Sequence, residues 1–506
     1  MSRAISRRRR RGRGIAEIPI ARADTRRKIP VYELLDEESL VSLENHAQWL
    51  LTEIGIEIRG DAEALRLFKA AGASVDGERL RFDPGHVQAL CSTAPRTYTM
   101  HARNPQRNIE FGGDNLILGP AYGSPFVTDL KAGRRYGTVE DFQNFIKLTY
   151  MSPWLQHQSG TVCEPVDVAV NKRHLDMVYA HLRYSDKPFM GSVTATDRAE
   201  DSLAMARIVF GEAFMQDHLV IQGNINVNSP LVYDDTMTGA LRAYAAANQG
   251  NVISSFILAG AMSPVTQAAL IAQAHAEVMV GIALTQLVRK GAPVVYGSFL
   301  TTMDLKTGAP TFGTPESSLT TMAISQLCRR LGLPFRCGGH LTASKLADAQ
   351  AMQESVETMN PAIMSGANFI FQAAGWLEGG LTIGYEKFVM DLDRCGAILR
   401  MINGLSIDAN ELAEDAYLEA GIGDNFLGVA HTLRNYRSAN YRAELADTSS
   451  FEQWRDDGSK DMQQRAHQRC NRMLGEYQLP PMDCAIDEAL LDYIAHRKAS
   501  MADAWY

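Results

Sequence analysis

Polar and aromatic side chains follow most of the short apolar runs in the middle of this sequence, at the point where each run ends. The set consists of Tyr122, Gln158, Asn224, Phe299, His340, Gln372, Trp376 and, shortly afterwards, Tyr385. Apart from the histidine these groups are neutral, and several carry aromatic rings. The face of each well-placed ring attracts a cation by about 0.5–2 kcal/mol. A neutral, ring-lined pocket suits a quaternary ammonium ion, which has no N–H to donate and no proton to lose.

The stretch FRCGGHLT (335–342) places two glycines and His340 where an apolar run passes into a helical pattern. Glycines remove side chains from an extended segment, so that a ligand or another backbone can approach closely. We therefore take His340 as a candidate binding residue, with a structural or solvent-facing histidine as the alternative. For the neighbouring Cys337, the alternation of side chains along a strand favours packing over nucleophilic chemistry.

Motifs for metals, nucleotides and nucleophilic catalysis are absent from the sequence. It contains no HExxH, GxSxG, P-loop or GxGxxG pattern and no paired carboxylates at neighbouring run ends. Its seven cysteines are scattered without a CxxC spacing, which argues against a structural zinc site and for a reducing cytoplasm. A metal would depend on the isolated His157, His340 or Glu378. We therefore predict that the chain binds no metal or nucleotide and is cytoplasmic.

The elements that must position these residues are eight apolar runs of strand length, most of them followed by a helical pattern. The runs cover 116–129, 154–163, 187–195, 218–230, 251–260, 292–301, 333–342 and 367–376. Strands that alternate with helices predict βαβ units and a parallel sheet. Eight such units predict a closed (β/α)8 TIM-type barrel, whose functional site lies at the carboxyl ends of the strands. The connection 130–153 reads as a hairpin or loop more than as a helix.

The 506 residues divide into four regions. We predict an Arg-rich disordered arm (1–29), a small N-terminal α/β lead-in (30–115), the barrel (116–402) and a helical C-terminal extension (403–506). Such extensions cap a barrel or build a subunit interface, and we expect a homo-oligomer. The seven arginines among the first 14 residues predict a solvated arm, with binding of phosphate or an acidic partner as the alternative.

Two classes of partner are not expected. No window of 18 uninterrupted apolar residues occurs, so that the sequence predicts no membrane span. Nucleic acid is likewise not expected as a partner. The expected ligand is a small molecule.

Three motifs together resemble the trimethylamine methyltransferase family. They are GPAYGSPFVTDLKAGRRYGTVEDF (119–142), GGHLTASKLADAQA (338–351) and GWLEGGLTIGYEKFVMD (375–391). The resemblance runs over about residues 30–480. It implies a (β/α)8 barrel that moves a methyl group from an amine to the cobalt of a separate corrinoid protein, so that the corrinoid is carried by the partner and is not bound intrinsically. The chain contains no pyrrolysine and is therefore similar to the non-pyrrolysine branch, which includes glycine betaine:corrinoid methyltransferases.

The chemistry of the leaving group agrees with that branch. A neutral tertiary amine must be activated before it departs, whereas a quaternary ammonium ion leaves as a neutral amine without help. Orientation and desolvation alone can then suffice, and we assign no certain catalytic residue. A betaine carboxylate would still need a partner in the pocket. We predict His340 for that role, because no lysine or arginine stands at an equivalent strand end.

Two other functions stay open on the sequence alone. A non-catalytic protein that binds or senses quaternary amines would need the same pocket but no corrinoid partner. A zinc-dependent methyltransferase of the betaine–homocysteine type would need a thiolate-rich metal site, and no adjacent cysteines occur. The sequence does not distinguish glycine betaine from other quaternary amines.

Overall fold

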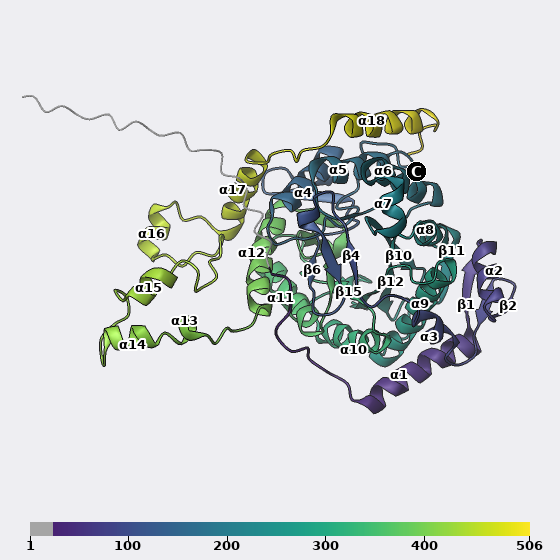
Figure 1. Cartoon of the computed structure of the whole chain (residues 1–506), viewed down its shortest axis with the longest axis horizontal. Coiled ribbons are helices and arrows are strands. Elements are labelled where there is room, and N and C mark those ends of the chain that lie inside the picture. The colour runs from purple at the N-terminus through teal and green to yellow at the C-terminus, as the bar shows by residue number, and fades with distance from the viewer. Residues whose placement is uncertain (1–23, 506) are drawn as a thin grey trace, which may run out of the picture.

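The centre of the protein is a curled sheet of seven parallel strands surrounded by helices (Figure 1). The computed structural model describes residues 24–505, so that most of the Arg-rich arm predicted for 1–29 lies outside the described residues. In spatial order the strands are β6 (Ile117–Leu118), β16 (Phe369–Phe371), β15 (Phe335–Gly338), β13 (Val294–Met303), β12 (Gly250–Ala259), β10 (Ile221–Val227) and β9 (Phe189–Met190). All six pairings are parallel, which confirms the predicted alternation of strands and helices.

The second predicted run, 154–163, forms no strand, and it lies between the two edges of the curled sheet. The backbone N–H groups of Gln156 and His157 donate to the Leu118 carbonyl beside β6, at 3.1 and 3.2 Å. On the other side Gln158 N donates to Pro188 O, and Met190 N donates to Ser159 O, both at 2.9 Å. Ser159 has φ of +55°, a left-handed conformation that interrupts a regular ladder. The structure is thus an α/β fold with a curled parallel sheet rather than a complete eight-stranded barrel.

Helices cover the outer face of the sheet. They are α4 (Val139–Met151), α5 (Arg173–Tyr184), α6 (Thr196–Phe210), α7 (Glu212–Asp217), α8 (Asp235–Ala246), α9 (Gln267–Val288), α10 (Pro315–Leu331), α11 (Ala349–Met364) and α12 (Tyr385–Ile402). The connection 130–153, expected to be a hairpin or loop, contains a hairpin strand followed by α4. A capping box between Thr138 and Asp141 starts this helix, which satisfies backbone donors that would otherwise stay unpaired.

The helix α9 is apolar nearly all round because both of its sides are covered. Among the described helices it alone is long and apolar enough to cross a membrane by length and composition, yet 89% of its apolar window is buried. On one side it packs against β12 and β13, and on the other against α1, α2 and α3 of the N-terminal region. An all-round apolar helix is expected where neighbours cover every face.

The N-terminal region packs over α9 and joins the rest of the fold through a small sheet. Its elements are α1 (Glu37–Trp49), the π-helix η1 (Leu50–Ile54), β1 (Ile56–Arg59), α2 (Ala62–Ala70), β2 (Ser74–Asp76), β3 (Arg79–Arg81) and α3 (His86–Cys91). Strand β1 pairs in parallel with β11 (Val232–Asp234), which follows β10 in the chain. The region predicted as an α/β lead-in is therefore tied by hydrogen bonds to β11, which follows a strand of the central sheet, as well as by packing.

The concave face of the curled sheet holds an apolar core of its own. The hairpin β4 (Tyr98–Met100) and β5 (Ile109–Phe111) closes it at one end, with the 3-10 turn η2 (Pro105–Arg107) between the two strands. The buried side chains of this core are Met100, Ile109, Phe111, Ile117, Met190, Leu219, Val252, Val295, Phe369 and Phe371. Because they come from strands all round the curl and touch one another, they identify the side chains that point inward.

A second small sheet follows the strands β6 and β16. Its strands are β17 (Trp376–Leu377), β18 (Thr382–Gly384), β7 (Phe126–Asp129) and β8 (Gly133–Tyr136), with the turn η3 (Glu378–Gly380) between the first two. Strand β13 extends into a hairpin with β14 (Pro310–Thr311). The chain segments that leave the carboxyl ends of the parallel strands are thus held by pairing of their own.

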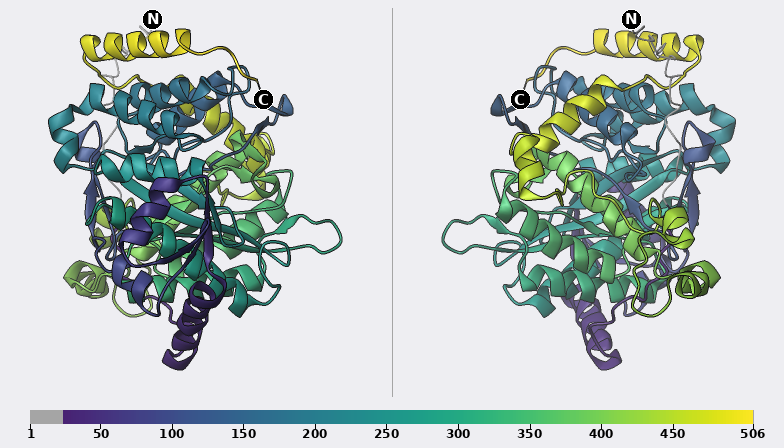
Figure 2. Two further views of the ribbon diagram at one scale, coloured as in Figure 1. Left: turned by 90° about the vertical axis from the view of Figure 1, so that its right-hand side faces the viewer. Right: turned by 90° about the vertical axis from the view of Figure 1, so that its left-hand side faces the viewer.

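The C-terminal region is helical, as predicted, and its parts lie apart from one another. Helices α13 (Ala409–Leu412), α14 (Glu414–Ala420), α15 (Ala430–Asn435) and α16 (Phe451–Asp456) project sideways from the ring of helices (Figure 1). Helix α17 (Met462–Gly475) returns and packs on α12. Helix α18 (Cys484–Ala499) lies across one end of the molecule, on α5 and α6 (Figure 2).

Lys187 fixes the turn that leads into the irregular segment between the sheet edges. Its ammonium group is buried and donates to the carbonyls of Thr149, Ser152 and Leu155, each at 2.7 Å. We expect Lys187→Met to lower the free energy of unfolding by about 2–4 kcal/mol, because three buried acceptors lose their donor. The exposed Lys290 provides the control, and Lys290→Met should leave the thermal midpoint unchanged. Equal midpoints for the two variants would show that Lys187 does not hold this turn.

Candidate active site

Arg336 lies inside the curl on β15 and is the one feature of the site that dominates its electrostatics. The side chain is 3% exposed. Its Nη2 donates to Gln372 Oε1 at 3.2 Å and its Nη1 to Ser298 O at 3.3 Å, while Nε has no partner among the described residues. The guanidinium carbon lies 4.4 Å from the ring centroid of Phe371. No carboxylate of the described chain pairs with it.

The charge of Arg336 therefore lacks an anion. Burial lowers its pKa to about 10, so that the group remains a cation at neutral pH. A buried charge without a counter-ion is costly, and neutral amides and carbonyls offset only part of that cost. The position is suited to a ligand that brings a negative charge.

The residues predicted from the sequence did not include this arginine. The sequence assigns the anion to His340 because no lysine or arginine stands at a strand end, and Arg336 lies outside that search because it is within the strand. It occupies the second position of β15, inside the strand, and its side chain reaches along the concave face. A signal was present, since an arginine in a buried parallel strand, which normally reads as an apolar run, is unusual.

Phe299 and Trp376, two of the predicted ring walls, come together. Their ring centroids are 5.8 Å apart. Phe256 stacks on Phe299 at 5.1 Å, and Phe312 lies edge-on to both Phe299 and Trp376 at 6.1 Å. Phe256 is 39% exposed, so the cluster of four rings reaches the surface on that side.

The aromatic cluster and the buried arginine are neighbours. Arg336 pairs in register with Gly297 of β13, and Phe299 is two residues further along the same face of that strand. The guanidinium carbon lies 6.0 Å from the Phe299 ring centroid. Phe256 and Phe312 were not predicted as walls. Phe312 follows the β13–β14 hairpin, and only the return of that hairpin brings it back to the cluster.

Tyr122, Gln372 and Asn224 also line the concave face. Tyr122 stacks on Phe371 with centroids 6.0 Å apart, and burial raises its pKa to about 12 although the charge of Arg336 opposes this. Gln372 accepts the hydrogen bond from Arg336, as described above. Asn224 donates to Asn226 Oδ1 at 3.3 Å and accepts from Ser254 at 3.4 Å. These neutral groups give the arginine polar surroundings without a compensating charge.

His340 is fully buried in a different cluster. Its Nδ1 lies 2.7 Å from Ala373 O and 3.8 Å from Asp391, whose carboxylate pairs with Lys387 at 2.5 Å. Burial, with the charge of Lys387 as a second cause, lowers its pKa to about 3. The ring is therefore neutral at physiological pH, and Nδ1–H donates to the carbonyl. What remains is an acceptor at Nε2, which has no partner among the described residues.

The glycines before His340 make room for side chains of the protein. A Cβ on Gly339 would lie 2.6 Å from Ile370 and 2.8 Å from Met359, and one on Gly338 would lie 2.9 Å from Leu341. Such distances are shorter than real carbon contacts. The GGH step therefore permits neighbouring side chains to pack closely on β15, whereas the sequence predicted the approach of a ligand or of another backbone.

Gln158 and Tyr385 have their polar groups engaged elsewhere. Gln158 Nε2 donates to Lys187 O at 2.6 Å, and its Oε1 lies 3.1 Å from His181 Nδ1. The Tyr385 hydroxyl donates to Asp141 at 2.9 Å, and its ring stacks on Phe145. Neither residue is in contact with Arg336 or with the four-ring cluster in the described structure.

The three isolated residues considered as metal ligands are also separated. His157 Nδ1 accepts from Ser159 N at 2.8 Å, and Glu378 pairs with Arg134 at 2.7 Å. Within residues 24–505, no group of three or more His, Cys, Asp or Glu side chains gathers as a metal site would require.

Comparison with known proteins places the chain in a family. The family model described as trimethylamine methyltransferase (MTTB) matches residues 3–502. The chain belongs to the trimethylamine methyltransferase family. The resemblance read from the three sequence motifs is thereby confirmed.

Relatives within the trimethylamine methyltransferase family differ in the amine named. Glycine betaine methyltransferase of Desulfitobacterium hafniense (strain Y51) is 38% identical over 470 residues, which cover 93% of this chain and 98% of the relative. A trimethylamine methyltransferase of the same species (strain DSM 10664 / DCB-2) is 27% identical and covers 88% of this chain and 90% of its own. Proline betaine:corrinoid methyltransferase of Eubacterium limosum is 27% identical, with 91% and 95% covered.

The unpaired state of Arg336 can be tested by stability alone. We expect Arg336→Met to leave the thermal midpoint unchanged or to raise it, because a buried uncompensated charge is removed. The free energy of unfolding should rise by at most about 2 kcal/mol. Arg135 is the contrasting case, since it holds the buried Asp141 with two hydrogen bonds of 2.5 and 2.7 Å. Arg135→Met should destabilise the protein by about 3 kcal/mol. Similar losses in both variants would mean that Arg336 is paired internally.

Proposed function

We propose that this methyltransferase takes a methyl group from a betaine, an amine that carries both a quaternary nitrogen and a carboxylate, and transfers it to the Co(I) of a separate corrinoid protein. The observation that carries the proposal is the unpaired Arg336 beside a cluster of aromatic rings. One part of the site favours a negative charge and the adjacent part favours a positive one. The names of the relatives that act on glycine betaine and proline betaine support the same class of substrate.

The cationic end of the substrate is assigned to the rings of Phe299, Trp376 and their neighbours. Ring faces attract an alkylammonium group and cannot deprotonate it. Both side chains are nearly buried, at 7% and 5% exposed, so that the attraction acts in a poorly solvated environment. Phe256 and Phe312 hold the two rings in place by stacking and edge contacts.

The carboxylate end is assigned to Arg336 rather than to His340. A guanidinium offers a planar fork of donors that matches a carboxylate, and its charge-assisted hydrogen bonds are strong in a dry site. A neutral His340 with an acceptor at Nε2 offers no donor to an anion. We assign His340 a positioning role, because its bond to Ala373 O ties β15 to the segment that leads to Trp376.

The titratable groups of the site favour a substrate that needs no acid. Tyr122 has a pKa of about 12, Arg336 of about 10 and His340 of about 3, so none of them exchanges protons readily near pH 7. When the C–N bond of a quaternary amine breaks, its electron pair stays on nitrogen and a neutral tertiary amine leaves. The acceptor cobalt supplies the electron pair of the new bond to the methyl group. The protein then has to orient the substrate and exclude water.

We further propose that residues 156–159 occupy the position of the eighth strand in a (β/α)8 barrel. Their backbone bonds to both sheet edges support this, as does the position of Phe299 and Trp376 toward the carboxyl ends of β13 and β16. The methyl acceptor would approach from that end. Seven cysteines without disulfides, six of them buried, support a reducing, cytoplasmic location.

The arginine distinguishes the substrate class. With free cob(I)alamin as acceptor, Arg336→Met should lower kcat/KM for glycine betaine. The expected loss of transition-state stabilisation is about 1.5–3 kcal/mol, the range for hydrogen bonds to charged groups. Tetramethylammonium has no carboxylate and should be affected far less. His340→Ala serves as the comparison and should impair both substrates similarly. If His340→Ala is selective for glycine betaine and Arg336→Met is not, the carboxylate site is at the histidine, as first read from the sequence.

The ring walls can be tested by binding. Replacing Trp376 or Phe299 by Leu should weaken the affinity for a quaternary amine by about 1–2 kcal/mol, mostly through lost cation–π attraction. Tyr385→Phe is a suitable control, because that ring stacks away from the cluster. Calorimetric titration with glycine betaine gives the affinities. Unchanged affinity in both Leu variants would show that these rings only pack.

A further inference from the structure

Residues 404–442, which we call the arm, make few contacts with the rest of the described chain. Among them only Ala416 and Val429 are buried. Many large apolar side chains of the arm are exposed instead, with Leu418 at 87% and Leu427 at 83%. The full set is Leu405, Ile407, Leu412, Tyr417, Leu418, Ile422, Phe426, Leu427, Leu433 and Tyr436. So many exposed apolar side chains in one segment are typical of a contact site rather than of a solvated surface.

The helices of the arm are too short to be stable alone. Helix α13 has four residues, α14 seven and α15 six. Isolated helices of fewer than about 12 residues are marginal in water, because the first turn is costly to form. Contacts within the arm are mainly polar and lie between its short helices. Arg434 pairs with Asp415, Ala430 N donates to Glu419, and Asn410 contacts His431 and Asn435, whereas Tyr417 with Phe426 is the one aromatic pair within the arm among the described residues. A second surface is required to hold these turns in a fixed arrangement.

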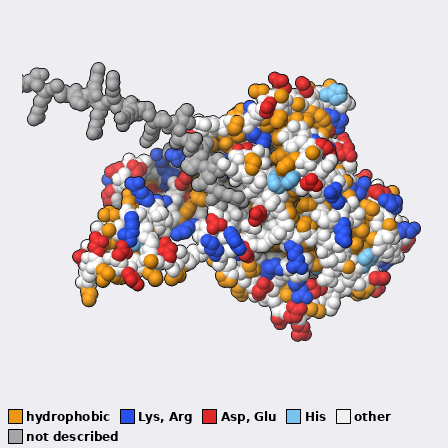
Figure 3. Space-filling model, viewed as in Figure 1, with side chains coloured by type: hydrophobic (Ala, Val, Ile, Leu, Met, Phe, Trp, Pro, Cys, Tyr) orange, Lys and Arg blue, Asp and Glu red, His pale blue; other side chains and the backbone are white. Residues whose placement is uncertain are grey.

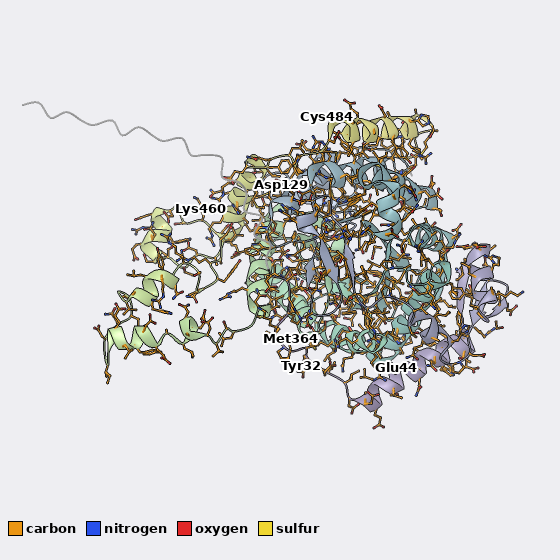
Figure 4. All side chains as sticks on the ribbon, in the orientation of Figure 1. Tyr32, Glu44, Asp129, Met364, Lys460 and Cys484 are labelled. Atoms are coloured by element: carbon orange, nitrogen blue, oxygen red, sulfur yellow. The ribbon has the colours of Figure 1, made fainter. Side chains whose placement is uncertain are left out.

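The arm leaves the body and returns to it at defined points. It begins after α12, and the returning chain is fastened to α12 where Tyr441 and Glu444 donate to Asp393 at 2.7 and 2.8 Å. Helix α17 then packs on α12. The space-filling view shows a separate lobe that carries apolar, acidic and basic side chains (Figure 3), and its side chains stand apart from the crowded interior of the ring (Figure 4).

Charge is distributed unevenly along the arm. The tip, 408–424, contains six acidic residues and no basic one. The root, 434–442, contains Arg434, Arg437 and Arg442 and no acidic residue. Arg437 and Arg442 are exposed, and neither pairs with a carboxylate of the described residues. Apart from the pair of Arg434 with Asp415 within one arm, the tip of one molecule is therefore complementary in charge to the root of another.

We propose that the arm docks on a second copy of this chain, with the acidic tip of each copy on the basic root of the other about a twofold axis. In such an isologous contact each residue pair occurs twice, so that one arm with opposite charges at its two ends is self-complementary. The exposed apolar side chains of both arms are then buried together. A corrinoid protein is the less suitable occupant, because the arm and the β13–β14 hairpin at the carboxyl ends project from opposite sides (Figure 2).

Sedimentation velocity on the full-length protein tests the contact. The wild-type chain should sediment as a dimer or a multiple of it. The double variant Leu418→Asp with Ile422→Asp should dissociate at least tenfold more readily, with an unchanged circular dichroism spectrum. Leu305→Asp alters a residue of similar exposure (77%) on the β13–β14 hairpin and should retain the wild-type mass. A monomeric wild type, or a double variant that stays associated like the control, would overturn the proposal.

Charge reversal tests which parts of the two arms meet. Glu411→Arg with Glu414→Arg should weaken association, and so should Arg437→Glu with Arg442→Glu. All four changes together restore opposite charges at tip and root and should restore the dimer. A fourfold variant no better than either pair would exclude the tip-to-root contact. Deleting residues 2–13 should leave the dimer intact. If the deletion causes dissociation, the acidic tip binds the arginine-rich N-terminal segment instead of the root.

A monomeric wild type would leave one further occupant to identify. If Leu418→Asp with Ile422→Asp then slowed transfer to the corrinoid protein but not to free cob(I)alamin, the arm would belong to that partner. Loss of activity with both acceptors would concern the proposed methyl transfer itself. These readouts separate failure of the arm contact from failure of the proposed function.

Discussion

The burial of one positive charge without a counter-ion is the constraint on which this structure turns. Removing a charge from water costs several kcal/mol, and the loss is recovered only when an opposite charge or a full set of hydrogen bonds replaces the solvent. Arg336 has two neutral acceptors and an aromatic face, and it is held rigidly among buried side chains. The buried cation therefore lowers the stability of the fold, and it is positioned for an anion that the described chain does not supply.

Two of the other buried cations in the described chain show how the protein satisfies such a charge. Lys187 donates to three carbonyls, which matches its three N–H bonds, and it ties the irregular segment between the sheet edges to α4. Lys387 pairs with Asp391, and that carboxylate also accepts from Gly375 N at 2.9 Å, one residue before Trp376. Both lysines are satisfied by the protein and support the framework. Arg27 and Arg336 are the buried arginines without a carboxylate partner among the described residues, and of these two Arg336 is the one that contacts the aromatic rings.

Much of the fold could be predicted from the sequence, because buried parallel strands and their helices leave a clear apolar rhythm. The run 154–163 has the same apolar rhythm but forms no strand. Its backbone is interrupted by the left-handed Ser159 and bonds to both sheet edges, and neither feature can be recognised in the local sequence. Phe299 and Trp376 were predicted as ring walls from their places at strand ends, and the structure brings their rings together. The pKa and the partners of His340 could not be predicted, because both depend on the packing of α12, which comes from a distant part of the chain. Arg336 was overlooked since a strand end was searched rather than the strand itself.

The pairing of β13 with β15 explains why the two halves of the site come together. Gly297 lies beside Arg336 in the register, and a side chain there would meet Ser254 at 2.1 Å, so only glycine leaves the concave face free at this level. Two residues on, Phe299 projects from the same face. The separation between the anion site and the ring walls is thus set by the rise of a strand and the spacing of adjacent strands, both of which are fixed by backbone hydrogen bonds. A substrate whose charges are joined by a short chain is matched to such a frame, because neither half of the site can move relative to the other without breaking the sheet.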